Sequence, residues 1–73
     1  MQDLRRVEMS EKNVRAIVWE CHGHSRYTVY LPIGSDGHPD GKILHGGHYG
    51  QVCETFEEAV DIARRCMQME ARG

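Results

Sequence analysis

The sequence lacks a long apolar segment, an even set of cysteines and a strong net charge. No hydrophobic run approaches the ~18 residues of a membrane span or follows the N-terminus as in a secretory signal, so we expect no membrane partner. The three cysteines have neither the even number of a disulfide scaffold nor zinc-finger spacing, which favours reduced thiols and a cytoplasmic location. A net charge of −2 disfavours tight binding to a phosphate backbone.

The chain is also short. Its 73 residues form one domain with a thin core, and self-association would add buried area. A domain of this size has little room for a pocket that excludes water, and the sequence neighbours Cys21 and His22 do not orient a base toward a thiolate. We therefore predict a protein that is not an enzyme and needs no cofactor.

The C-terminal part has the pattern of an amphipathic helix over residues 55–70. Thr55 followed by Glu58 is a capping box, and acidic residues precede basic ones, as the helix dipole favours. Apolar residues recur every three or four positions and form one stripe that we expect to pack in the core: Phe56, Ala59, Val60, Ala63, Cys66 and Met67.

Two earlier segments, Asn13–Glu20 and Arg26–Pro32, alternate like strands and are rich in β-branched and aromatic residues. The short link between them fits a hairpin. One helix can cover only one face of such a sheet. The residues that we expect beneath the helix are Val14, Ala16, Val18, Tyr27, Val29 and Leu31.

The remaining segments complete the expected fold. Residues 33–42 are rich in glycine and aspartate and predict an exposed loop, and a third strand follows within residues 42–53. Residues 1–11 are compatible with an edge strand, a short helix or a frayed end. The prediction is a single α+β domain (residues 1–73), with an antiparallel sheet of three or four strands, centred on residues 12–53, and one C-terminal helix on one face (β-β-β-α).

The face of this sheet away from the helix is unusual for a surface exposed to solvent. It combines apolar, aromatic and basic side chains: Arg15, Ile17, Trp19, Arg26, Thr28 and Tyr30. Either the N-terminal segment covers it, or it binds a partner, which would be a second copy of the chain, another protein or a nucleic acid.

The stretch "LHGGHYG" (44–50) and the stretch "CHGH" (21–24) raise the possibility of zinc. If the second and third strands pair so that opposed residue numbers sum to about 74, His48 lies beside Arg26 and near His24, and Cys53 lies close to Cys21. A zinc site from His22, His24 and His48 is then conceivable, although the spacings match no established pattern. The two glycines either form a two-residue hairpin turn, with His45 opposite His48, or a bulge that sends these histidines toward different faces; the bulge is favoured.

The strand order and the helix opening "ETFEEAVDIARRC" resemble two groups of small β3α modules over about residues 14–67. One is the arm-type DNA-binding domain of phage tyrosine integrases, with its plant ethylene-response relative. That resemblance implies a mobile-element protein that lays its sheet in the DNA major groove and uses Arg15, Trp19 and Arg26. The other is the HicB-like antitoxin fold, in which a strand similar to "RYTVYLP" precedes such a helix. It implies neutralisation of a small RNA-cleaving partner by direct contact.

Three functions follow in order of preference. The first is a protein-binding or homodimeric module that uses the face around Arg15, Trp19 and Tyr30. The second is a nucleic-acid-binding module with Arg15, Arg26 and Lys42 on phosphates or bases and Trp19 or Tyr30 stacking. The third is a domain stabilised by zinc.

Overall fold

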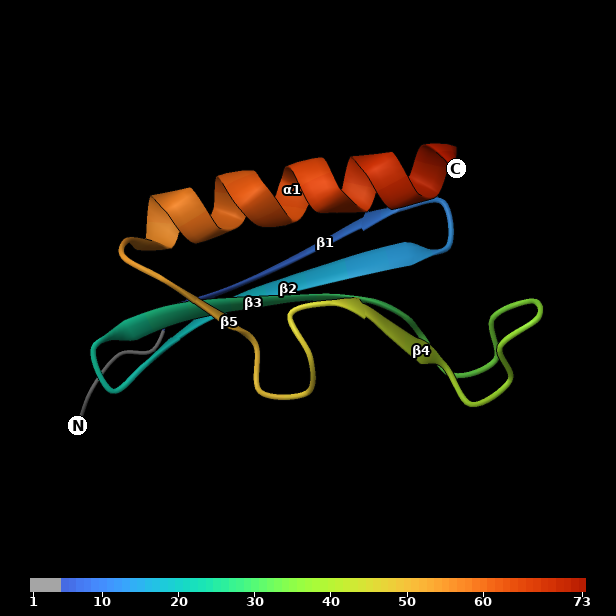
Figure 1. Cartoon of the computed structure of the whole chain (residues 1–73), viewed down its shortest axis with the longest axis horizontal. Helices are drawn as coiled ribbons and strands as arrows, with labels where there is room; N and C mark the ends of the chain where they lie inside the picture. The colour runs from blue at the N-terminus through green and yellow to red at the C-terminus, as the bar shows by residue number, and fades with distance from the viewer. Residues whose placement is uncertain (1–4) are drawn as a thin grey trace.

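Five strands and one helix make up the fold in a computed structural model, which describes residues 5–73 (Figure 1). The sheet is antiparallel in the order β1-β2-β3-β4, and β5 pairs with β3 beyond the end of β4. The elements are β1 (Arg6–Glu11), β2 (Val14–Cys21), β3 (His24–Leu31), β4 (Lys42–His45), β5 (Gln51–Cys53) and α1 (Phe56–Arg72). The predicted α+β class is confirmed. The sheet has one more strand than expected because the third strand is split into β4 and β5.

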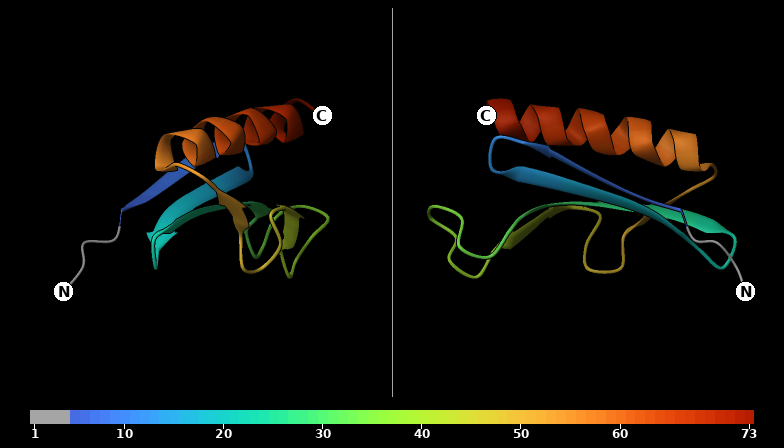
Figure 2. Two further views of the ribbon diagram at one scale, coloured as in Figure 1. Left: turned by 60° about the vertical axis from the view of Figure 1, so that its left-hand side comes forward. Right: turned by 180° about the vertical axis from the view of Figure 1, so that it is seen from behind.

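Helix α1 lies across one face of the sheet, and the turns that precede β4 and β5 extend on the opposite side (Figures 1 and 2). No helix in the described part of the chain combines the length and the apolar character that a bilayer crossing requires.

The N-terminal segment forms an edge strand, one of the three alternatives that its sequence left open. β1 pairs with β2 from Arg6 opposite Trp19 to Glu11 opposite Val14, and a two-residue turn joins them. The β2–β3 turn is equally tight. Its central residues, His22 and Gly23, have φ angles of 52° and 79°, as a type I′ hairpin turn requires. His22 therefore contributes to this turn through its backbone conformation.

The core lies between α1 and the strands beneath it. Val18 and Val29 are fully buried, and four helix residues close over them: Phe56, Ala59, Ala63 and Met67. Five of the six predicted strand positions are buried, whereas Leu31 is only half-buried at the edge of the cluster. Val60 and Cys66, at the margins of the predicted helix stripe, are also half-buried.

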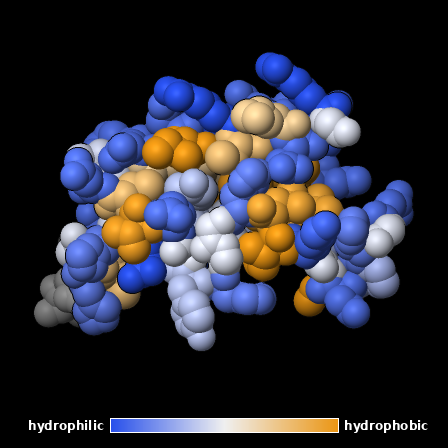
Figure 3. All heavy atoms as spheres, in the orientation of Figure 1, coloured by the Kyte–Doolittle hydropathy of each residue, from blue (hydrophilic) through white to orange (hydrophobic). Residues whose placement is uncertain are grey.

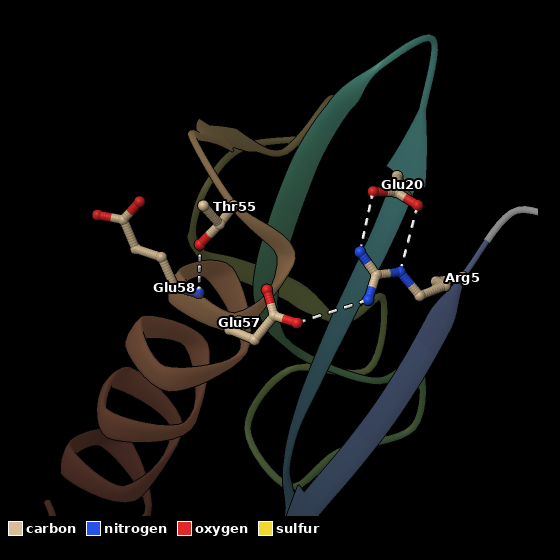
Figure 4. Close-up of polar contacts among 5 residues, drawn as sticks. All are labelled: Arg5, Glu20, Thr55, Glu57 and Glu58. Carbon is tan, nitrogen blue, oxygen red and sulfur yellow. Dashed lines mark hydrogen bonds and ion pairs between the residues drawn. The ribbon is translucent and has the colours of Figure 1, made fainter.

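The helix begins at the predicted cap. Thr55 Oγ1 accepts a hydrogen bond of 3.0 Å from the N–H of Glu58 (Figure 4). The Glu58 carboxylate reaches back to the N–H of Glu54, at 3.3 Å, so the expected return bond to Thr55 is displaced by one residue. At the other end the helix continues two residues past the predicted limit, and the N–H of Gly73 donates to the carbonyl of Glu70.

Arg5 joins the start of β1 to both β2 and α1 (Figure 4). Its guanidinium donates two hydrogen bonds to Glu20, at 3.3 and 3.2 Å, and lies 3.6 Å from Glu57. The same group lies 4.4 Å from the centre of the Phe56 ring, within cation–π range. The hydrogen bond to Glu20 raises the pKa of Arg5. Arg5 thus connects the edge strand to the N-terminal turn of the helix.

Candidate functional site

The six residues predicted to share the outer face of the sheet do share one face, which we call the open face. The β2–β3 register places Arg15 opposite Tyr30, and Trp19 opposite Arg26. Ile17 is opposite Thr28 in the same ladder. Directly opposed residues in an antiparallel pair project to the same side, and this side is the one away from α1.

The open face is covered in part by the loop between β4 and β5, Gly46–Gly50, which projects away from the helix (Figure 1). Thr28 Oγ1 donates to the carbonyl of Gly47 at 3.0 Å, and Arg26 Nη1 donates to that of Tyr49 at 3.1 Å. Thr28 is consequently only 5% exposed. The expectation that the N-terminal segment covers this face is wrong for its described part, because β1 pairs at the sheet edge.

Glycine is required at both ends of this loop. Gly46 and Gly50 have φ angles of 90° and 85°, which favour glycine. A Cβ atom at Gly50 would lie 2.5 Å from Cη2 of Trp19, and one at Gly46 would collide with the carbonyl oxygen of Tyr27. The loop can therefore pack against the open face only with glycine at these two positions.

The two histidines of "LHGGHYG" lie on opposite sides of the sheet, as the bulge alternative predicted. Neither the two-residue turn nor the bulge describes the whole geometry, because residues Gly46–Gly50 form a five-residue loop between β4 and β5. His45 Nε2 lies 2.8 Å from a carboxylate oxygen of Glu70 on α1, and His48 lines the open face.

A groove of about 670 Å³, the open-face groove, lies beside this loop. Its lining is mainly β1, β2 and β3, with contributions from β4 and the loop: Arg5, Arg6, Ile17, Trp19, Glu20, Cys21, Thr28, Tyr30, Ile43 and His48. A second depression of about 720 Å³ shares Tyr30, Ile43 and His48 with it and continues to Ile33. The two depressions adjoin at these three shared residues.

Two large apolar side chains near these depressions are exposed to solvent. Ile33 is 83% exposed and Tyr49, in the Gly46–Gly50 loop, is 85% exposed. Elsewhere the surface is more mixed: the view in Figure 3 shows hydrophobic atoms in separate clusters among hydrophilic ones. The exposed Ile33 side chain borders the second depression, so it enlarges the apolar area available to a ligand.

The open face also carries cations without acidic partners. Arg15 donates to the carbonyl of Lys12, and Arg26 to that of Tyr49, but neither forms an ion pair within residues 5–73. Lys42, exposed at the start of β4, also lines the second depression, but it is opposite Leu31 and therefore on the helix side of the sheet, so it does not share the open face with the two arginines. The first turn of α1, on the other side of the sheet, is acidic. The two arginines and the acidic first turn of α1 therefore lie on opposite sides of the sheet.

The histidines proposed as zinc ligands come from three separate places. His22 is in the β2–β3 turn, His24 begins β3, and His48 is in the Gly46–Gly50 loop. Nowhere among residues 5–73 do three His, Cys, Asp or Glu side chains form a group suited to a metal ion.

The expected strand register is right beside β4 and wrong beside β5. Val29 lies opposite His45, as a sum of 74 requires, but Arg26 lies opposite Val52 and Ser25 opposite Cys53, where the sum is 78. The Gly46–Gly50 loop absorbs the difference, so His48 does not pair with Arg26.

Cys53 is correspondingly not a neighbour of Cys21 in the sheet, because Cys21 pairs with His24. It packs against the core instead, and burial raises the pKa of its thiol, with the Glu58 charge adding to the effect. Burial also raises the pKa of Tyr27, to which the nearby Cys66 and Cys53 contribute. These groups belong to the helix side, away from the open-face groove.

The fold and face described above define a small α+β domain in which one helix covers one face of an antiparallel sheet. The chain matches no protein-family model, no curated protein and no solved structure significantly. The resemblances to integrase arm domains and HicB-like antitoxins thus stay fold-level expectations.

Proposed function

We propose that the protein is a non-enzymatic binding module whose open-face groove holds a segment of another protein. The segment would carry apolar side chains flanked by Asp or Glu. The observation that carries the proposal is the apolar groove on the open face, together with Arg15 and Arg26, which lie on the same face outside the groove lining and have no ion-pair partner within residues 5–73.

Burial of apolar area would supply most of the affinity. Ile17 and Trp19 are successive open-face residues of β2, Tyr30 is diagonal to Ile17 on β3, and Ile43 is opposite Tyr30 on β4. All four side chains are only half-buried. Each Å² of apolar surface removed from water contributes about 25 cal/mol, and aromatic side chains concentrate this area in few residues. A groove of this kind favours a ligand with Leu, Ile, Phe or Trp side chains.

The arginines of the open face favour a negatively charged ligand. Arg15 and Arg26 lie on the groove side, whereas the first turn of α1 carries Glu57 and Glu58 on the other. An acidic segment would be attracted to these arginines and repelled by the first turn of α1, which would steer its approach toward the open face.

Nucleic-acid binding on the open face is less well supported than protein binding. Base stacking needs an aromatic ring with an accessible face, but the Trp19 ring packs against the backbone at Gly50. The net charge of −2 also gives a weak electrostatic contribution to phosphate binding. A protein ligand uses the apolar floor of the groove, which a phosphate backbone leaves unused.

The test selects short random peptides displayed on phage against the folded protein and measures their affinity for variants. Enriched peptides are expected to combine Asp or Glu with large apolar residues. Ile43→Ser and Arg15→Glu should each weaken binding by about tenfold or more. Arg64→Glu, the same charge change on the exposed surface of α1, is the matched control and should leave the affinity unchanged.

Absence of any enriched peptide, or peptides that bind Ile43→Ser as well as the parent protein, would overturn the proposal. Salt-dependent binding of duplex or single-stranded DNA that Arg15→Glu abolishes, without enrichment of acidic peptides, would establish the nucleic-acid alternative in its place.

A further inference from the structure

The two edges of the sheet differ in their capacity to pair with another strand. The β4/β5 edge consists of strands of four and three residues interrupted by the Gly46–Gly50 loop, which protects it from regular pairing. β1 is a continuous six-residue strand, and within residues 5–73 no strand pairs with its outer side. Of the two edges, β1 therefore offers the longer uninterrupted strand for pairing with another strand.

The β1–β2 ladder identifies the backbone groups on that outer side. The N–H of Glu20 donates to the carbonyl of Arg5 at 3.0 Å, so Arg5, which continues the β1–β2 register, is a hydrogen-bonded position whose carbonyl points toward β2. Hydrogen-bonded and non-hydrogen-bonded pairs alternate along an antiparallel ladder. The backbone N–H and C=O groups of Arg6, Glu8 and Ser10 consequently point outward.

The charged side chains of this edge can pair with those of the same edge in a second copy of the chain. Arg6 and Glu8 lie on the open face, opposite Trp19 and Ile17 respectively, and form an ion pair at 2.8 Å. Val7, between them, lies on the helix side and is only half-buried.

We propose that two copies of the chain associate through β1 in an antiparallel register centred on Val7. In this register Arg6 of each copy is directly opposite Glu8 of the other, and the outward backbone groups of both residues form hydrogen bonds. The alternative register centred on Glu8 places two glutamates opposite each other, which is unfavourable.

The dimer is a continuous sheet of ten strands, five from each copy. Because directly opposed residues share a face, both helices lie on one side and both open faces on the other. Val7 packs against its counterpart at the two-fold axis, which covers its exposed part. Arg6 lines the open-face groove, so the association also brings the two grooves to neighbouring positions.

The test is the molar mass by sedimentation equilibrium of the parent chain and of charge variants. The parent is expected to approach twice 8.4 kDa as its concentration rises. Arg6→Glu or Glu8→Arg alone places like charges opposite each other and should weaken dimerisation by about tenfold or more. The double variant Arg6→Glu/Glu8→Arg has the composition of the parent and should recover its affinity.

A second variant tests the backbone contribution. Glu8→Pro removes an outward N–H without removing a β1–β2 hydrogen bond, and proline is tolerated at such edge positions. It should give a monomer with an unchanged circular dichroism spectrum. Ile43→Ser, on the open face, should stay dimeric, which separates this association from ligand binding in the groove. A parent chain that is monomeric at millimolar concentration, or a double charge variant that does not recover dimerisation, would overturn the proposal.

Discussion

Replacement of Gly50 by alanine is the sharpest perturbation of the open face. The alanine would adopt a φ of 85°, which costs about 1 kcal/mol or more for a residue with a Cβ atom. Its Cβ would lie 2.5 Å from the Trp19 ring, so either the ring or the loop must move. Displacement of the loop breaks the hydrogen bonds that Arg26 and Thr28 donate to it, each of which contributes about 1 kcal/mol. The expected total is about 3 kcal/mol.

Gly47→Ala is the matched control. Gly47 also has a positive φ, of 65°, but nothing lies within 4 Å of a Cβ atom there, so the expected cost is only the backbone strain of about 1 kcal/mol. Urea unfolding followed by the fluorescence of Trp19, the single tryptophan, measures both variants. Gly50→Ala should also change the emission of the folded state. Equal destabilisation by the two variants, with unchanged emission, would refute the packing of the loop on Trp19.

Two further predictions concern the helix and the core. Thr55→Ala removes the acceptor for the N–H of Glu58 and should destabilise the fold by about 1 kcal/mol in urea unfolding, whereas Thr55→Ser should be nearly neutral; equal stability of the two would contradict the capping role. The raised pKa values of Tyr27 and Cys53 mean that the unfolded chain releases these protons first. Their contribution to stability is therefore complete below the ordinary pKa values, 10.0 for Tyr27 and 9.0 for Cys53, and is lost as pH rises further. Unfolding free energies should fall between pH 8 and about pH 11, by less in Tyr27→Phe; stability that rises over this range would contradict the assignment.

Local patterns in the sequence were sufficient to predict the elements that local physics determines. The alternation of Val14, Ala16 and Val18 identifies a face because side chains in a strand repeat every two residues. The Thr55–Glu58 pair marks the helix start because the first N–H groups of a helix need acceptors. These signals are independent of the rest of the chain, and the structure confirms them.

The features that were missed depend on contacts between distant segments. Gly46 and Gly50 are required by the approach of their backbone to Tyr27 and Trp19, which sequence spacing does not reveal. The resulting loop shifts the register at Cys53 and buries Thr28, a residue that alternation alone places on an exposed face. A glycine pair flanked by a third glycine is the one signal that indicated irregular backbone here.

Only some of the residues that line the open-face groove could be predicted from the sequence. Ile17, Trp19 and Tyr30 follow from alternation in two strands that the pattern identifies well. Ile43 and Arg6 were not predicted, because their strands have short or ambiguous sequence patterns and join the face only through pairing. The open-face groove is thus a tertiary feature, of which the sequence predicts only residues on β2 and β3.

The central claim is that the open-face groove binds an acidic, apolar protein segment. Its most direct test is a titration of ¹⁵N-labelled protein with a peptide selected by display, followed by amide chemical shifts. We expect shifts concentrated at Ile17, Trp19, Tyr30 and the Gly46–Gly50 loop, with α1 unaffected. Shifts confined to the exposed surface of α1, or none with any selected peptide, would contradict it.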